Sequence, residues 1–75
     1  SHLFREEMGI SFLDYLTSVR ISIAKKLLIQ RELSMLQICL EVGYQDPSHF
    51  SKVFKKKEGI SPTEYRKQSI EQNAD

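Results

Sequence analysis

The sequence predicts an all-α fold, and three observations support this prediction. Apolar side chains recur at spacings of three and four along residues 12–30, which is typical of the buried side of an amphipathic helix. Ser, Asp and Gly residues bound the expected helices, in the positions that favour helix starts and stops. One residue pattern also occurs twice, 50 positions apart, and both copies are typical of a junction between two helices.

Composition limits the architecture to one small domain, because the chain has only 75 residues. An apolar content of 40% and a charged content of 28% are close to globular averages. No apolar run approaches the ~18 residues of a membrane span, so no membrane partner is expected. The single cysteine, Cys39, forms no internal disulfide and fits a reducing, cytoplasmic location.

The residue pattern does not indicate an enzyme. His2, His49 and Cys39 lack the spacing of metal ligands, and no nucleophile, base and orienting group occur together. We therefore expect no enzyme, no metal and no cofactor.

The first elements are the end of one helix and a long second one. Residues 1–8 end at Gly9, which suits a left-handed stop, and Ser11 is a good N-cap for residues 12–30. At 1.5 Å per residue the long helix would span roughly 28 Å. Its predicted buried stripe consists of Phe12, Tyr15, Leu16, Val19, Ile23, Ala24, Leu27 and Leu28.

Two short helices separated by a glycine follow a polar connection at residues 30–33. Ser34 and Gln37 form a capping-box pattern that opens a helix over residues 35–42, and Gly43 breaks it. Asp46, followed by a proline, predicts the start of a helix over Pro47–Glu58.

The last helix is predicted to be short. Gly59 ends the preceding helix, and Ser61 followed by Pro62 starts the last one, which carries Tyr65. Residues 70–75 have few anchors, so we expect a frayed tail there.

The repeat aligns the two ends of the chain. Its identities are Phe4 with Phe54, Gly9 with Gly59, Ile10 with Ile60, Ser11 with Ser61 and Tyr15 with Tyr65. The counterparts of residues 35–46 would precede Ser1. We therefore interpret the chain as one complete module, preceded in the sequence by only the distal part of another.

Residues 34–58 fit a helix-turn-helix that reads DNA. A helix, a glycine-containing break and a second helix form this motif, and the second helix enters the major groove. Its local charge is favourable, because residues 47–67 hold six basic and two acidic side chains. The residues expected between the two helices are Met35, Ile38, Cys39, Val42, Tyr44, Phe50, Val53 and Phe54.

Position along the second helix separates two roles. Ser48, His49 and Lys52 lie in its first half and are the candidate base-reading residues. Lys55 and Lys56 lie later and are the candidate phosphate contacts. An ordinary surface histidine is an equally good interpretation of His49, and the lysines alone also fit a solvated helix face.

A series of spaced residues covers most of the chain and is densest in its second half. Its members are Ala24, Leu27, Leu28, Ile38, Cys39, Val42, Gly43, Tyr44, Asp46, Ser48, Phe50, Ser51, Phe54, Lys55, Gly59, Ser61, Pro62, Tyr65 and Arg66. In this spacing the chain resembles the AraC/XylS family of bacterial transcription regulators. Cys39 departs from the family, which usually has Ala there, and we interpret it as a core residue.

The resemblance implies a homeodomain-like three-helix subdomain, joined by a linker helix to a partial second helix-turn-helix. Residues 1–10 would be the remnant of the first unit, residues 11–30 the linker and residues 34–69 the second unit. It further implies double-stranded DNA and RNA polymerase as partners, and an effector or dimerisation domain elsewhere in the full-length chain.

The resemblance also extends the predicted site beyond the second unit. Ser1 and His2 would face bases and Arg5 would face phosphate in the first unit. Arg20 matches a common family arginine on the linker, where a phosphate contact and an intramolecular salt bridge are equally good interpretations.

A helical protein-interaction module without direct DNA contact is the alternative function. The two interpretations differ in salt dependence, because binding through several phosphates weakens steeply as the salt concentration rises.

Overall fold

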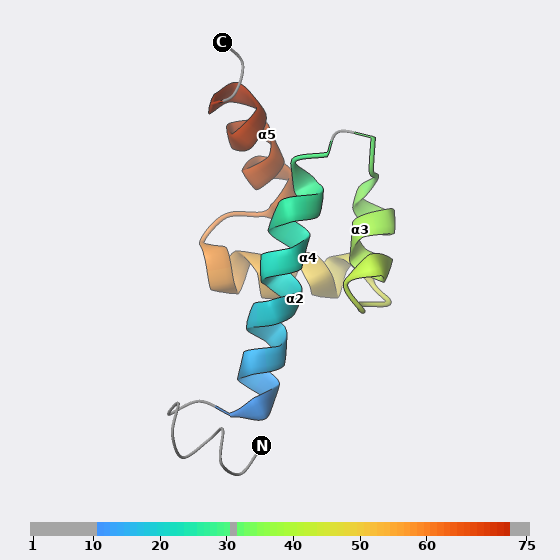
Figure 1. Cartoon of the computed structure of the whole chain (residues 1–75), viewed down its shortest axis with the longest axis vertical. Coiled ribbons are helices and arrows are strands. Elements are labelled where there is room, and N and C mark those ends of the chain that lie inside the picture. The colour runs from blue at the N-terminus through green and yellow to red at the C-terminus, as the bar shows by residue number, and fades with distance from the viewer. Residues whose placement is uncertain (1–10, 31, 73–75) are drawn as a thin grey trace.

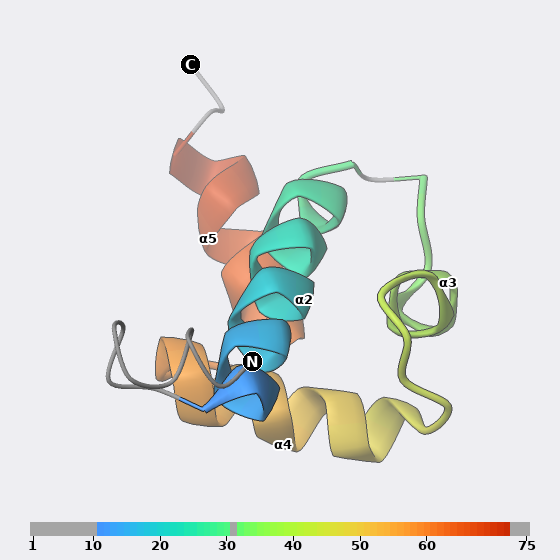
Figure 2. The same cartoon turned by 60° about the horizontal axis from the view of Figure 1, so that its bottom comes forward.

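The structure is a computed structural model that describes residues 11–30 and 32–72, and all of the secondary structure there is helical. The helices are α2 (Phe12–Leu28), α3 (Met35–Glu41), α4 (Pro47–Glu58) and α5 (Pro62–Gln72). The three shorter helices all pack against α2 (Figure 1). Figure 2 shows α4 crossing α2, with α3 beside the N-terminal end of α4. The predicted all-α fold is confirmed.

Local side-chain caps explain where the helices start. At each start a side-chain oxygen accepts a backbone N–H at 3.0 or 3.1 Å, in the pairs Ser11–Asp14, Ser34–Gln37, Asp46–Ser48 and Ser61–Glu64. The N–H of Ser34 also donates to Oε1 of Gln37 at 2.8 Å, which completes the predicted capping box. These bonds satisfy amides that have no partner within a helix.

The core lies in the angle between α2, α3 and α4. Its buried side chains are Ile21, Ala24, Leu28, Ile38, Cys39, Val42, Tyr44, Phe50 and Phe54, with Met35, Val53 and Tyr65 partly buried against them. The predicted set between the two helices is therefore confirmed. Three aromatic rings form a row from α4 to α5. The ring centroid of Phe54 lies 5.9 Å from that of Phe50 and 5.6 Å from that of Tyr65.

The buried stripe of α2 differs from the prediction. Ile21, which was not included, is 2% exposed, whereas Ile23, which was included, is 44% exposed. Phe12 and Tyr15 at the start of the predicted stripe are also exposed. Spacing alone allows several apolar stripes on this helix, and the buried one is the side on which α3, α4 and α5 pack.

Three helix ends also differ from the prediction, and the smallest difference is in α3, which ends at Glu41 rather than at residue 42. α2 ends at Leu28 rather than at residue 30, and the guanidinium of Arg66 donates to the carbonyl of Leu28 and to that of Gln30 beyond the helix end. α5 continues to Gln72, past the expected start of fraying at residue 70. Ile70 is half-buried, so packing supports this last turn. The expected helix remnant within residues 1–10 lies outside the described residues.

Candidate nucleic-acid interface

Helix α4 presents one polar side to solvent. The exposed side chains of Ser48, His49, Lys52, Lys55 and Lys56 form what we call the outer face of α4. At 3.6 residues per turn these five positions occupy an arc of about 120°. Phe50 and Phe54 lie opposite and are buried. The structure thus brings the five sequence-predicted residues of this helix together on one side.

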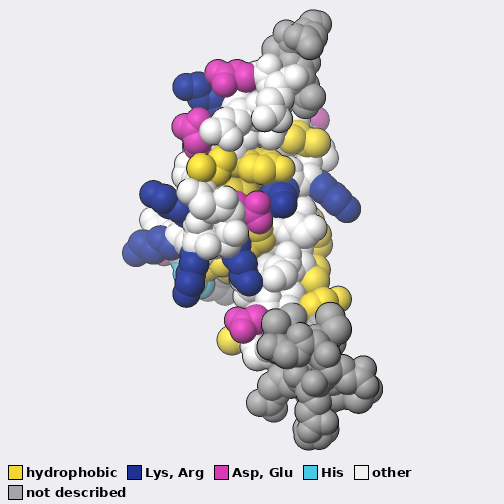
Figure 3. Space-filling view, turned by 90° about the vertical axis from the view of Figure 1, so that its left-hand side faces the viewer, with side chains coloured by type: hydrophobic (Ala, Val, Ile, Leu, Met, Phe, Trp, Pro, Cys, Tyr) yellow, Lys and Arg dark blue, Asp and Glu magenta, His cyan; other side chains and the backbone are white. Residues whose placement is uncertain are grey.

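Positive charge dominates the outer face. Three of its five residues are lysines. The acidic residue beside them at the start of the helix is Asp46, whose carboxylate accepts the N–H of Ser48. Figure 3 shows Lys and Arg side chains gathered at mid-height on one margin of the molecule. Such a local cluster attracts a polyanion even though the chain has a net charge of only +1.

The neighbouring Lys57 belongs to a different surface. Its Nζ donates to Oγ of Ser18 on α2 at 3.3 Å. One residue further, Glu58 forms a salt bridge with Lys25 of α2, with Nζ and Oε1 3.2 Å apart. The C-terminal end of α4 is therefore tied to α2, which fixes the direction of the outer face.

The turn between α3 and α4 is compact. Gly43 has a φ of +102°, a left-handed conformation that favours glycine, and the N–H of Tyr44 donates to the carbonyl of Cys39 at 3.0 Å. The Cys39 thiol in turn donates to the carbonyl of Tyr44 at 3.3 Å. Burial, together with the nearby Asp46 carboxylate, raises the pKa of this thiol above its ordinary value. Cys39 is therefore a core residue, as predicted.

Arg20 reaches this turn from α2. Its guanidinium carbon lies over the Tyr44 ring, 5.4 Å from the ring centroid. Within residues 11–30 and 32–72 the structure shows no carboxylate paired with Arg20. Ser1, His2 and Arg5, the remaining predicted contacts, lie outside the described residues.

Arg66 has a structural role that the sequence did not predict, although it belongs to the basic segment and to the spaced series. Its Nε donates to the carbonyl of Leu28 at 2.7 Å, and its Nη2 donates to those of Gln30 and Leu33 at 3.1 and 2.7 Å. It thus joins α5 to the connection between α2 and α3. Its only sequence signal is its place after Tyr65 in the spaced series.

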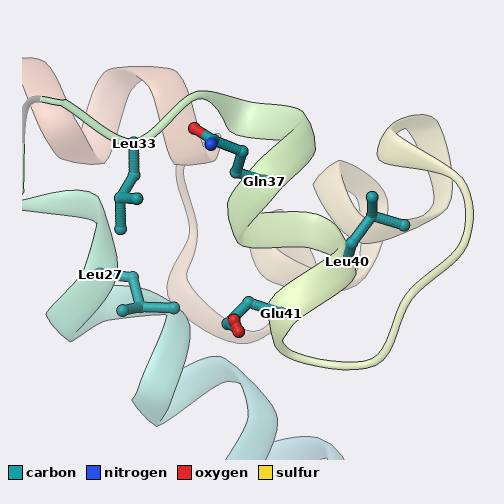
Figure 4. Close-up of a pocket in the computed structure, with 5 residues that line it drawn as sticks. All are labelled: Leu27, Leu33, Gln37, Leu40 and Glu41. Atoms are coloured by element: carbon teal, nitrogen blue, oxygen red, sulfur yellow. The ribbon is translucent and has the colours of Figure 1, made fainter.

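A second surface is apolar and lies between α2 and α3. Figure 4 shows this groove, with Leu27 of α2 facing Leu33 of the connection; the other lining residues are Gln37, Leu40 and Glu41 of α3. Leu36 and Leu40 on α3 are 51% and 55% exposed. A leucine-lined groove with a carboxylate does not attract phosphate, so we do not assign it to the nucleic-acid interface.

None of the helices in residues 11–30 and 32–72 is long and apolar enough to cross a membrane. In the same part of the chain, no three His, Cys, Asp or Glu side chains are grouped closely enough to hold a metal ion.

Comparison with known proteins places the chain among transcription regulators. The family described as "Helix-turn-helix domain" matches residues 1–68. An uncharacterized HTH-type transcriptional regulator of Haemophilus influenzae is 48% identical over 65 residues, which are 87% of this chain and 22% of the relative. The arabinose operon regulatory protein of Escherichia coli K12 is 46% identical over 66 residues, 88% of this chain and 23% of that protein. The chain thus spans less than a quarter of the length of these relatives.

Solved structures agree with the family match. The C-terminal domain of AraT, a response regulator from Geobacillus stearothermophilus, has a TM-score of 0.85 and 41% identity, over 91% of this chain and 56% of that one. A DNA-binding transcriptional dual regulator from Escherichia coli K-12 has a TM-score of 0.83 and 30% identity, over 88% and 60%. The chain belongs to the AraC-type family of helix-turn-helix domains, which bind DNA in bacterial transcription regulators and are not enzymes.

Proposed function

We propose that α4 is the recognition helix and that its outer face enters the major groove of double-stranded DNA. The observation that carries this proposal is the exposure of Ser48, His49, Lys52, Lys55 and Lys56 on one side of a helix whose other side is buried. A helix that presents such a polar side fits the width of the major groove.

Within this face we assign base reading to Ser48, His49 and Lys52. They lie in the first half of α4, and the N-terminal residues of a recognition helix reach base edges. Lys can donate to guanine O6 and N7, whereas Ser and His can donate or accept. Lys55 and Lys56 lie one to two turns later and carry point charges, so we assign them to phosphates.

The test compares three lysines of the same helix. Lys52→Ala should relax the preference at one base pair by ~1–3 kcal/mol, and Lys55→Ala should weaken binding to all sequences alike. Lys57→Ala is the matched control, because its side chain is directed to Ser18 on α2. Binding to a randomised DNA pool, followed by titrations of single sites, measures both quantities.

Salt dependence gives the second readout. Lys55→Ala should reduce the slope of log affinity against log salt by ~0.9, the value for one phosphate contact, and Lys57→Ala should leave it unchanged. Wild-type binding that is flat between low and moderate salt would falsify the proposal and favour a protein-interaction module. Equal scaling of every site by Lys52→Ala and Lys55→Ala would contradict the division of roles.

We further infer that the remaining parts of the regulator lie outside this chain. The chain spans less than a quarter of its curated relatives, one of which is named an arabinose operon regulatory protein. An effector or dimerisation domain and the contact with RNA polymerase are proposed for the full-length protein. We also propose a cytoplasmic location, because a DNA-binding regulator acts where the chromosome is.

A further inference from the structure

Tyr44, in the turn before α4, contacts side chains from two directions. The guanidinium of Arg20 lies over its ring at 5.4 Å, and the His49 imidazole meets it at a centroid distance of 5.4 Å with the ring planes 89° apart. The three side chains line one open hollow, together with Gly43, Gln45 and Asp46. A residue of α2 is thereby connected to the outer face of α4 through a single ring.

The Tyr44 ring is held firmly enough to transmit this contact. It is 7% exposed and packs on Phe50 of α4, with 5.7 Å between ring centroids. Arg20 also lies close to the turn, since a Cβ built at Gly43 would lie 3.2 Å from its Nε and 3.3 Å from its Cζ. The guanidinium thus occupies a space that any other residue at position 43 would narrow.

We propose that Arg20 is a positioning residue for base recognition, which acts through Tyr44 on His49. This inference rests on the proposed function, because it requires His49 to face a base pair. Arg20 does not contact DNA in this scheme. Together with Phe50, it holds the Tyr44 ring against which His49 lies, and so limits the orientations that the imidazole can take at the start of α4.

The chemistry of the guanidinium explains why arginine suits this place. A planar, weakly hydrated guanidinium stacks on an aromatic ring, whereas the compact lysine ammonium is strongly hydrated. Arg20→Lys therefore keeps the positive charge but loses the planar contact. Arg20→Gln removes the charge and keeps a planar end group of shorter reach.

The experiment measures base preference and salt slope for Arg20→Lys, Arg20→Gln and His49→Ala in this chain. Lys26→Gln is the matched control, because Lys26 is an exposed cation on the same helix. His49→Ala should flatten the preference at one base pair by at least about fivefold, the lower end of what a well-formed base contact supplies. Both Arg20 variants should flatten that same base pair and leave the salt slope unchanged.

A double variant and a spectroscopic signal separate positioning from general destabilisation. Arg20→Lys combined with His49→Ala should have no larger effect at that base pair than His49→Ala alone, because both act on one contact. The imidazole proton signals of His49 by NMR should move toward those of an unstacked histidine in Arg20→Lys. Thermal unfolding of each variant checks that the fold is retained.

Three results would overturn the inference. If Arg20→Lys behaves as wild type while Arg20→Gln weakens all sequences and lowers the salt slope by ~0.9, Arg20 contacts a phosphate. If Arg20→Lys weakens every base pair equally, its role is only structural. If His49→Ala leaves base preference intact, His49 reads no base and Arg20 cannot act through it. The Lys52→Ala and salt measurements then still decide separately whether α4 binds DNA.

Discussion

At the scale of single residues, Arg66 shows how one side chain can close a junction between helices. Its three hydrogen bonds go to the carbonyls of Leu28, Gln30 and Leu33, which have no continuing helix to accept from. Hydrogen bonds from a charged donor are stronger than those between neutral groups. Arg66 therefore fixes where α2 ends and how α5 lies beside it.

We expect Arg66→Ala to lower the free energy of unfolding by about 2–3 kcal/mol, because bonds to charged groups contribute ~1.5–3 kcal/mol each and this site is only half-buried. Arg66→Lys should lose less, since an ammonium can still reach part of the same set but lacks the planar fork. Urea denaturation followed by circular dichroism measures both.

The neighbouring Lys67 provides the control for this prediction. Lys67 is exposed, so Lys67→Ala should change the free energy of unfolding by no more than about 0.5 kcal/mol. An equally small effect of Arg66→Ala would show that water replaces its hydrogen bonds without cost.

At the scale of elements, the two described glycines with positive φ end helices in different surroundings. Gly59 follows α4 with a φ of +87°, and a Cβ built there meets nothing within 4 Å. Gly43 follows α3 with a φ of +102°, and its Cβ would crowd Arg20. Both positions carry the cost of a left-handed backbone, but only Gly43 adds a steric one.

Gly59→Ala should therefore cost roughly 1–2 kcal/mol of stability, the usual penalty for an L-residue in this conformation. Gly43→Ala should cost about 1 kcal/mol more, since overpacking typically costs 1–3 kcal/mol. Denaturation of the two variants in parallel measures the difference. Repeating both in an Arg20→Ala background should abolish it; a difference that persists there has another origin than Arg20.

The elements also show which features the sequence could predict. Helix starts depend on bonds between residues two or three apart, such as Ser34 with Gln37, and all four were predicted. The bounds of Pro47–Glu58 and the exposed face of this helix were predicted for the same reason. The choice of Ile21 over Ile23 and the bonds of Arg66 depend on which distant helix lies alongside, and spacing within one helix does not contain that information.

At the scale of the whole molecule, the described residues form a three-helix unit packed against one long helix. The unit encloses Ile21, Ala24 and Leu28, while Phe12 and Leu13 near the start of α2 are more than half exposed. The role of α2 as a linker between two units remains a prediction. The assignment of residues 1–10 to the first unit remains a prediction as well.

Global stability should depend on pH through the buried thiol of Cys39. Its pKa is raised in the folded chain, so unfolded molecules lose this proton first once the pH exceeds about 9.0, the ordinary value. The unfolded state then binds fewer protons than the folded state, and stability falls as the pH rises. This loss is absent below that range.

Cys39→Ala isolates this contribution from the other groups that titrate at alkaline pH. The difference in unfolding free energy between wild type and variant should be constant from pH 6 to 8. Above that range it should shift against the wild type by at most about 1.4 kcal/mol per pH unit. Chemical denaturation at a series of pH values measures it, and a constant difference up to pH 11 would show that the thiol ionises alike in both states.

The complete burial of Cys39 has a practical consequence for labelling. The sequence contains no other thiol, and this one has no exposed surface. A maleimide or nitroxide reagent can therefore attach only to molecules whose core has opened, and the attached group prevents that core from closing again. A fluorescent or spin-labelled derivative for distance measurements therefore needs a new cysteine on an exposed position such as Lys67, and Cys39→Ala in the same chain prevents labelling of opened molecules.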